Sequence, residues 1–354
     1  MATYDFIFDW LGLRDWCGAR ETGSAPMTMA ELLAGGKKAT ADADAGLSLG
    51  DVWNVPPPSL DNLNEACPAI ARTRDMTEAV ENGFIAGKDP LNVVLDPMTQ
   101  PLSWLLDGAL ALAEATPWWV TIIVLSLVVF WASRSWRLVS RVAAILFFLT
   151  IIDHFDFAMQ TLSIIFVCAA LCVLFGVPIG IAMSRNDRLQ KIIIPILDML
   201  QTLPTFVYLI PLIFLFSVTE SKLYGIAIIL YAIVPVIRLT DLGIRLVDRE
   251  VIEAADAFGM TKRQKLFGVQ IPLALPNIMA GVNQTIMMAL ALVVIASLVS
   301  APGLGVLVLR GIRNLELGVG LVAGLGIVLI AIMLDRVTKE ALARVNAANS
   351  VQRH

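Results

Sequence analysis

The sequence has few charged and few chemically reactive side chains. Only 16% of its 354 residues are charged, and it contains two histidines, His154 and His354, and four cysteines. Neither histidine has a nucleophile or a metal ligand near it in the sequence, and no cysteines show the CxxC spacing of a metal site. The pattern GxxxxGK[ST], which binds nucleotide phosphates, is absent. These absences argue against catalysis by this chain, ATP hydrolysis included.

The four cysteines fall into two settings. Cys168 and Cys172 lie inside an apolar run and are expected to be small core residues. Cys17 and Cys67 lie in the acidic amino-terminal part, and they are able to pair only if that part lies outside the cytoplasm, where disulfides persist. Their spacing fixes no pairing, so both states of Cys17 and Cys67 stay open.

Hydrophobic residues dominate the composition. They make up 57% of the chain, and the mean hydropathy is +0.76, which is typical of an integral membrane protein and excludes an ordinary soluble domain. Charge is unevenly distributed: residues 1–116 hold 7 basic and 17 acidic residues, whereas the remainder holds 19 and 13. The two parts of the chain are therefore expected to lie in different surroundings.

The amino-terminal part is expected to carry little regular structure. Residues 1–100 are acidic and rich in Ala, Gly, Asp and Pro, which predicts a largely irregular extracytoplasmic tail with a few short helical turns. No basic leader and long apolar run open the sequence, so no cleavable signal peptide is predicted. Residues 101–116 show an apolar stripe interrupted by Asp107 and Glu114, which indicates an amphipathic helix at the membrane interface.

Long apolar segments follow this part, and seven of them are predicted to cross the membrane. They lie at 117–133, 138–153, 159–184, 192–217, 223–239, 274–300 and 318–335. The first two form an accessory region, 117–153, before a core domain, 154–340, that includes a cytoplasmic loop, 240–272; residues 341–354 form a cytoplasmic tail. The predicted fold class is an all-α integral membrane protein.

Basic residues predict the orientation. They follow the first, third and fifth predicted spans, and cytoplasmic loops are enriched in Lys and Arg. The amino terminus is therefore expected outside and the carboxyl terminus inside, in an inner membrane. Arg310 and Arg313 are the exception, because the count of spans places them outside, in a short helix packed at the mouth.

The loop after the fifth span has the helix start and stop signals of a helical hairpin. Val251, Ile252, Ala255 and Phe258 recur at helical spacing, and Gly259 is placed to end that helix in a left-handed conformation. A capping box from Thr261 then predicts a second helix, which is expected to continue until Pro272. Periodicity alone allows two uses, a hairpin lying on lipid headgroups or an apolar face that needs a protein partner.

Glu253-Ala254-Ala255, Gly259 and Val269-Gln270-Ile271-Pro272 resemble the EAA signature of binding-protein-dependent ABC importer permeases, which ends in Ile-x-Leu-Pro; Val269 and Ile271 depart conservatively from it. The stretches LDMLQTLPTFVYLIPLIFLF, IMAGVNQTIMMALALVVIASLV and GLGVLVLRGI are similar to glycine betaine/proline betaine permeases. The likeness covers about residues 100–340 and implies a type I importer permease fold with about seven transmembrane helices.

The resemblance implies that the hairpin couples the permease to a separate ATPase subunit, which would bind ATP and Mg. It also implies an extracytoplasmic substrate-binding protein, two ATPase copies and, most economically, a second copy of this chain; a paralogous partner stays open. The cargo would be a quaternary ammonium or related solute. The implied coupling residues are Val251, Ile252, Glu253, Ala254, Ala255, Phe258, Gly259, Thr261, Val269, Ile271 and Pro272.

Polar residues inside the fourth and sixth spans are candidates to line a translocation path, since such groups usually face a bundle interior. Interhelical hydrogen bonding is an equally good interpretation. The aromatic rings among them offer faces to a quaternary ammonium cation, although such rings are more often core. The candidates are Asp198, Gln201, Thr202, Phe206, Tyr208, Asn283, Gln284 and Thr285.

Two other classes of function stay open. A secondary transporter would couple transport to ions through intramembrane carboxylates, of which Asp198 is the strongest candidate. A gated channel for small osmolytes would suit a Gly-rich span such as 318–326, but it would give the hairpin no role. The sequence does not indicate which solute is carried.

Overall fold

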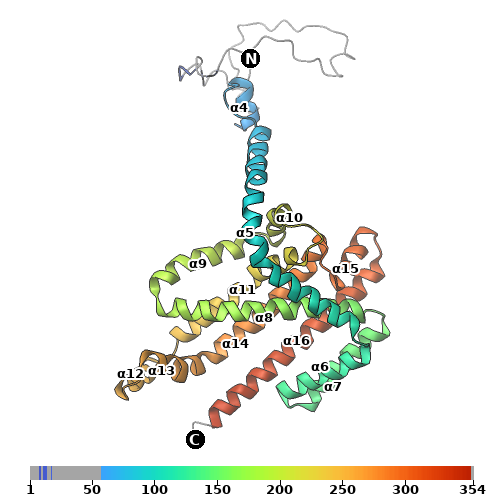
Figure 1. The fold of residues 1–354 in the computed structure, drawn as a ribbon, viewed down its shortest axis with the longest axis vertical. Helices are drawn as coiled ribbons and strands as arrows, with labels where there is room; N and C mark the ends of the chain where they lie inside the picture. Colours follow the sequence, from blue (N-terminus) through green and yellow to red (C-terminus); the bar gives the residue numbers. More distant parts are fainter. Residues whose placement is uncertain (1–7, 9–10, 14–16, 18–56, 352–354) are drawn as a thin grey trace, which may run out of the picture. The chain divides into compact units, whose positions relative to one another are not determined.

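The computed structural model describes residue 8, residues 11–13, residue 17 and residues 57–351, with side chains up to residue 344. The regular structure in this part of the chain is helical. The chain divides into two compact units, Met1–Asp89 and Pro90–His354, and the helices of both are labelled in Figure 1.

Cys17 and Cys67 form a disulfide in the first unit, which settles the alternative that the sequence left open. Phe8, Ala66 and the two cysteines make a small buried cluster. Helix α4, Leu60–Ala66, begins at Ser59, whose hydroxyl accepts a hydrogen bond from the Asn62 amide at 3.2 Å.

Helix α5, Thr73–Ala115, corrects the predicted boundary at residue 100. It runs through Pro90, Pro97 and Pro101, which the sequence analysis assigned to a largely irregular tail. The predicted interfacial helix 101–116 is therefore the end of a longer helix. Leu102 and Leu106 pack against Gly225 of helix α11, Ser221–Arg245, so tertiary packing offsets the low helix propensity of the prolines.

Polar contacts also join α5 to the end of α10, Leu209–Leu215, and to the start of α11. The Asn92 amide donates to the Leu215 carbonyl at 2.9 Å, and the Lys222 ammonium lies 2.8 Å from the Asp96 carboxylate. Asp107 accepts a hydrogen bond from Ser221. Lys222 is only 3% exposed. We call these contacts the α5–α11 junction.

The remaining helices of the second unit largely follow the predicted spans. They are α6 Trp118–Ser133, α7 Trp136–Ile151, α8 Phe155–Arg185, α9 Asp187–Thr202, η1 Thr205–Tyr208, α10 Leu209–Leu215, α12 Arg249–Ala257, α13 Lys262–Lys265, η2 Leu266–Gln270, α14 Ile271–Ala296, η3 Ser297–Val299, α15 Leu304–Arg313 and α16 Leu317–Val351. The short helix α15 contains Arg310 and Arg313, as predicted.

The span count of seven needs correction. Among the described residues four helices are long and apolar enough to cross a membrane, or up to six if each of two sharply bent pairs is one span. Helix α7 is outside this count because its 16 residues reach about 24 Å at about 1.5 Å per residue, short of a hydrocarbon core of about 30 Å. The predicted span 192–217 bends by 106° between α9 and η1, where Pro204 breaks the helix.

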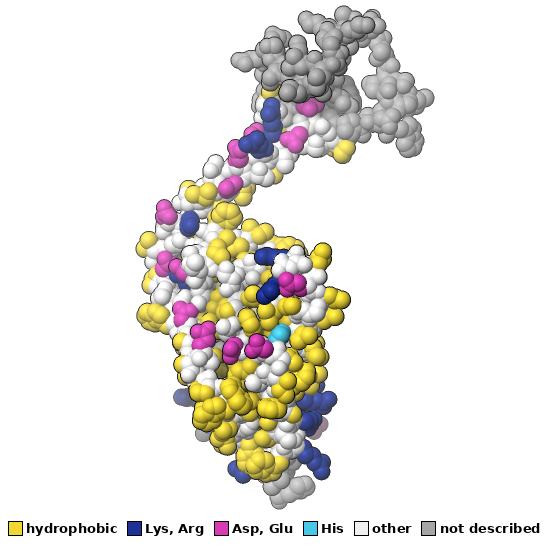
Figure 2. Space-filling model, turned by 90° about the vertical axis from the view of Figure 1, so that its right-hand side faces the viewer, with side chains coloured by type: hydrophobic (Ala, Val, Ile, Leu, Met, Phe, Trp, Pro, Cys, Tyr) yellow, Lys and Arg dark blue, Asp and Glu magenta, His cyan; other side chains and the backbone are white. Residues whose placement is uncertain are grey.

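Helix α11 packs against both α8 and α14 (Figure 1). Small residues allow these helices to approach closely. A Cβ on Gly180 of α8 would lie 2.7 Å from the Ile237 carbonyl oxygen of α11, and one on Gly281 of α14 would lie 3.0 Å from the Val236 Cα. Large hydrophobic side chains such as Trp131 and Phe166 are exposed. Figure 2 shows hydrophobic side chains gathered over much of one face of the molecule, which is typical of lipid contact.

Candidate functional site: the helical hairpin after α11

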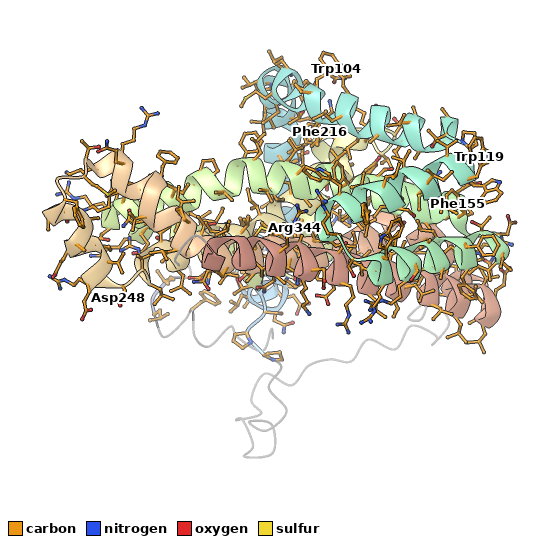
Figure 3. All side chains as sticks on the ribbon, turned by 90° about the horizontal axis from the view of Figure 1, so that it is seen from below. Trp104, Trp119, Phe155, Phe216, Asp248 and Arg344 are labelled. Carbon is orange, nitrogen blue, oxygen red and sulfur yellow. A yellow bond between two sulfur atoms is a disulfide. The ribbon has the colours of Figure 1, made fainter. Side chains whose placement is uncertain are left out.

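The first helix of the hairpin is fixed at its start by its own sequence. The Asp248 carboxylate accepts a hydrogen bond from the Glu250 amide at 3.0 Å and so caps α12. Arg249 pairs with Glu253 one turn later at 3.1 Å, with both side chains largely exposed. Figure 3 labels Asp248 at the hairpin end of the molecule, away from Trp119 and Phe155.

Gly259 makes the turn between the two hairpin helices. Its φ of +74° is left-handed, as predicted, and its amide donates to the Asp256 carbonyl at 2.9 Å. The Met260 amide donates to the Ala255 carbonyl at 3.1 Å. These two bonds form a Schellman motif, in which a side chain on the glycine would be strained by about 1 kcal/mol or more.

Thr261 starts the second helix through the predicted capping box. Its hydroxyl accepts from the Gln264 amide at 3.4 Å, and the Gln264 side chain accepts from the Thr261 amide at 2.9 Å. Asp256 and Lys265 then join the two helices, with the ammonium 2.6 and 2.8 Å from the two carboxylate oxygens. The capping box and the Asp256–Lys265 ion pair therefore both stabilise the turn.

The expected end at Pro272 is wrong. Helix continues from Lys262 to Val299 through the proline. A short π-helix, η2, precedes it, and the Ile271 amide bonds to the Leu266 carbonyl. The wider turn removes the need for a regular hydrogen bond at Pro272, which has no amide hydrogen to donate.

The four apolar residues at helical spacing, Val251, Ile252, Ala255 and Phe258, differ in burial. Ala255 is 5% exposed, and Ile252 packs on a cluster of Ile244, Val247, Ala274 and Ile278 within this chain. Leu266 is also buried. These residues hold the hairpin against the ends of α11 and α14.

A second set of apolar side chains faces outward. Phe258 is 87% exposed and Phe267 is 59% exposed, and both line an open depression with Met260 and Gly259. Val251 is exposed on the same helix as Phe258, seven residues earlier. We call Val251, Phe258, Met260 and Phe267 the docking surface. Met260 and Phe267 were not among the predicted coupling residues, although apolar residues flanking a capped turn were a signal for them.

The other predicted coupling residues lie around this surface. Glu253, Ala254 and Pro272 are exposed, and Val269 and Ile271 are half-buried. The pairing of Glu253 with Arg249 within α12 means that a partner's basic group would compete with an existing ion pair.

Most predicted path residues of the bent span are exposed or already paired. Asp198 of α9 forms an ion pair with Arg238 of α11. The Thr202 hydroxyl bonds to the Met199 carbonyl, and Gln201 and Phe206 are exposed. Tyr208 is buried beside Tyr231 of α11, with the ring centroids 6.5 Å apart.

The predicted path residues of α14 point in different directions. Asn283 donates to Asp335 of α16 at 3.1 Å, Gln284 is exposed, and Thr285 is fully buried. The bonds of Asp198 and Asn283 fit the interhelical interpretation. Sequence reasoning missed Arg238 and Asp335 because a pairing partner on another helix leaves no local pattern.

A further polar network lies where α8, α9 and α11 meet. Arg245 bonds to Asp241, Asp187 and the Met183 carbonyl at 2.8 to 2.9 Å, and Gln190 donates to Asp241 at 2.7 Å. The described residues hold no group of three or more His, Cys, Asp or Glu side chains able to bind a metal ion.

Comparison with known proteins shows the family of this chain. Residues 172–339 match the family described as binding-protein-dependent transport system inner membrane component. The glycine betaine/proline betaine transport system permease protein ProW of Escherichia coli is 38% identical over 307 residues, or 86% of this chain and 85% of that protein. This chain belongs to the binding-protein-dependent ABC permease family.

Other permeases are similar to this chain over shorter lengths. The glycine betaine permease OpuAB of Bacillus subtilis is 43% identical, covering 60% of this chain and 77% of its own length. A solved structure of the MetNI methionine ABC transporter matches 53% of this chain and 94% of its own, with 19% identity and a TM-score of 0.48.

As an ABC importer permease, the protein is a multi-pass inner-membrane subunit that works with an ATPase and a substrate-binding protein. The family match includes the hairpin and its braced turn and leaves out α5 to α7.

Proposed function

We propose that this permease imports small quaternary ammonium or related compatible solutes, of the glycine betaine, proline betaine, choline and trimethylamine N-oxide class. The similarity to ProW over most of both chains carries this proposal. The trimethylamine N-oxide permease TmoV of Ruegeria pomeroyi, 36% identical over 71% of this chain and 38% of its own length, adds support.

The docking surface is the part that contacts the ATPase. Phe258, Met260 and Phe267 expose apolar area beside a rigid turn, and such area is stabilised by burial against a partner. Glu253 and Ala254 lie exposed next to it and are assigned to the contact, with Glu253 exchanging Arg249 for a basic group of the ATPase. Gly259 and Thr261 fix the backbone conformation of the turn that carries this surface.

Two copies of this chain form the translocating assembly. Each copy offers a single EAA hairpin, and two ATPase subunits are needed to sandwich nucleotide between them. ATP and Mg are bound by those ATPase subunits, and this chain contributes no catalytic group.

The amino terminus lies outside and the carboxyl terminus inside, which needs an odd number of spans, and five lies within the range of four to six given above. The Cys17–Cys67 disulfide supports this orientation because disulfides persist in oxidising compartments. Arg344 near the end of α16 donates to the Trp131 and Ala132 carbonyls at 2.5 and 3.3 Å, which brings its charge beside the basic turn after α6. Lys and Arg gather on the cytoplasmic side of membrane proteins.

Reconstitution in proteoliposomes tests the function. The chain is reconstituted with its ATPase and binding protein, and uptake of radiolabelled glycine betaine is measured with and without ATP. The expected result is uptake that needs ATP and both partner proteins. Uptake by the purified chain alone, driven by an ion gradient, would show instead a secondary transporter.

A further inference from the structure

Helices α6 and α7 lie outside the residues that match the permease family, and the proposed function gives them no role. They lie side by side and contact α16 (Figure 1). The turn between them carries Arg134, and the first two turns of α7 carry Arg137 and Arg141; all three residues are exposed. Arg344 of α16 is also exposed and donates to two carbonyls at the end of α6. Four positive charges therefore gather at one end of this helix pair.

Acidic side chains do not balance these charges. Within the part of the chain that the structure describes, no carboxylate lies within ion-pair distance of Arg134, Arg137 or Arg141. Arg249 of the hairpin, by contrast, pairs with Glu253. The Arg141 side chain also donates to the Arg137 carbonyl at 3.1 Å, which keeps its charge near the first turn of α7. Like charges four residues apart on a helix repel each other, and a bound anion removes that repulsion.

An apolar stripe continues from the arginines along α7. Ala144, Phe148 and Ile151 follow Arg137 and Arg141 at intervals of three or four residues, so the five share one face of the helix. All five are exposed, so the rest of the described chain leaves this face open. The face therefore presents positive charge at one end and hydrocarbon along the remainder.

Two exposed tryptophans flank the arginines. They are Trp131 near the end of α6 and Trp136 at the start of α7. The Trp136 ring is held against Phe130, with the ring centroids 4.6 Å apart. Tryptophan is enriched at the level of lipid headgroups, because its ring is apolar and its N–H is polar. The two rings therefore indicate that the arginines lie at the depth of the headgroup phosphates.

We propose that this face of α7 binds an anionic phospholipid. Arg137 and Arg141 donate to the headgroup phosphate, because the guanidinium fork matches the geometry of phosphate oxygens. Arg134 and Arg344 add positive charge around the headgroup, and an acyl chain lies along the apolar stripe. A zwitterionic lipid offers the same acyl chain without net charge, and a soluble anion offers charge without the chain. The proposal concerns lipid alone and does not depend on the transported solute.

Native mass spectrometry of the full-length permease in detergent measures the binding of single lipid molecules. Phosphatidylglycerol is the anionic probe, with phosphatidylcholine and inorganic phosphate as separate probes. Phosphatidylglycerol is expected to bind several-fold more tightly than phosphatidylcholine, and phosphate is not expected to displace it. Arg137→Gln and Arg141→Gln are each expected to weaken its binding about fivefold, which corresponds to about 1 kcal/mol for each basic residue near an anionic surface. The double variant is expected to lose about thirtyfold.

Matched variants separate a lipid site from general attraction. Replacing both arginines by lysine keeps the two charges and is expected to retain most of the binding. Lys262→Gln combined with Arg263→Gln removes two exposed charges from α13 and is expected to leave phosphatidylglycerol binding unchanged.

Four outcomes would overturn the proposal. Equal losses in the α7 and α13 double glutamine variants would show only general attraction of positive charge. Equal affinity of the unchanged protein for the two lipids would show hydrocarbon contact alone, and displacement by phosphate would assign the arginines to a soluble anion. Absence of bound lipid, together with loss of dimers in the α7 variants, would assign the face to a second copy of the chain.

Discussion

The α5–α11 junction buries a charged side chain, whereas the hairpin exposes a large apolar one. At the junction Lys222 is buried between Asp96 and Glu220 at 2.8 and 2.9 Å and lies 5.1 Å from the Phe216 ring. The hairpin satisfies its backbone through caps but leaves Phe258 almost fully exposed. The junction is complete within this chain, whereas the hairpin has apolar area that this chain does not cover.

The largest expected effect comes from Gly259. Valine there would have to adopt a left-handed φ that a β-branched side chain strongly disfavours, so the turn would rearrange. Gly259→Val is expected to abolish ATP-driven uptake while leaving membrane insertion and ATP hydrolysis by the ATPase intact. Uptake and hydrolysis are measured together in proteoliposomes. Gly108→Ala is the control, because a Cβ there meets no atom within 4 Å and the residue lies in α5, outside the hairpin. Normal coupling in Gly259→Val would contradict the role of the turn.

Breaking the junction is expected to affect stability more than coupling. Lys222→Met removes a buried ammonium and leaves Asp96 and Glu220 without their cation, which is expected to lower the free energy of unfolding by about 2 kcal/mol. Thermal unfolding in detergent measures this change. The exposed pair Arg74–Glu78 provides a comparison, since Arg74→Met is expected to have no measurable effect. Equal melting temperatures for the two variants would show that the Lys222 ion pairs contribute nothing to stability.

A smaller effect is expected at the brace of the hairpin. Asp256→Ala and Lys265→Met each break a partly exposed ion pair, which contributes about 0.5 kcal/mol. Each single variant is expected to lose less than about half of the uptake rate, and the double variant to lose no more than either, because the two residues share one interaction. Additive losses in this double-mutant cycle would mean that they act separately.

The smallest expected effect is a difference in ATPase binding between variants of Glu253 and of Arg249. Both side chains are largely exposed, so neither is expected to affect the stability of the permease. Glu253→Gln is expected to weaken ATPase binding a few-fold, as for loss of an exposed charge pair, whereas Arg249→Ala leaves it unchanged or slightly tighter. Titration of labelled ATPase onto the permease in nanodiscs measures both. An equal loss for the two variants would indicate that their ion pair only supports α12.

Local signals explain why the hairpin was predictable. Gly259, Thr261 and Gln264 lie within one stretch of six residues, so spacing alone indicates the turn and the capping box. The burial of Ala255 and the exposure of Phe258 were not predictable, because they depend on where α12 rests against the ends of α11 and α14. Periodicity defines a face of a helix but not what covers it.

Other features of the fold were not predictable, because they depend on contacts between residues that are distant in the sequence. Cys17 and Cys67 are 50 residues apart, and Lys222 and Asp96 are 126 apart, so no local pattern indicates either pairing. The prolines of α5 favour irregular structure by propensity, and tertiary contacts such as the packing of Leu102 and Leu106 on Gly225 offset that preference. The family signature predicts a coupling element, but it does not indicate which of its residues the chain keeps for its own core.

Site-specific photo-cross-linking tests the central claim, that the outward face of the hairpin contacts the ATPase. A photoreactive phenylalanine analogue replaces Phe258 in one variant and Ala255 in another, and each is irradiated in the assembled transporter. Phe258, at 87% exposed, is expected to cross-link to the ATPase, whereas Ala255, at 5%, is expected to give only links within the permease. Cross-links from Phe258 to lipid alone would contradict the account and assign the hairpin to the membrane surface.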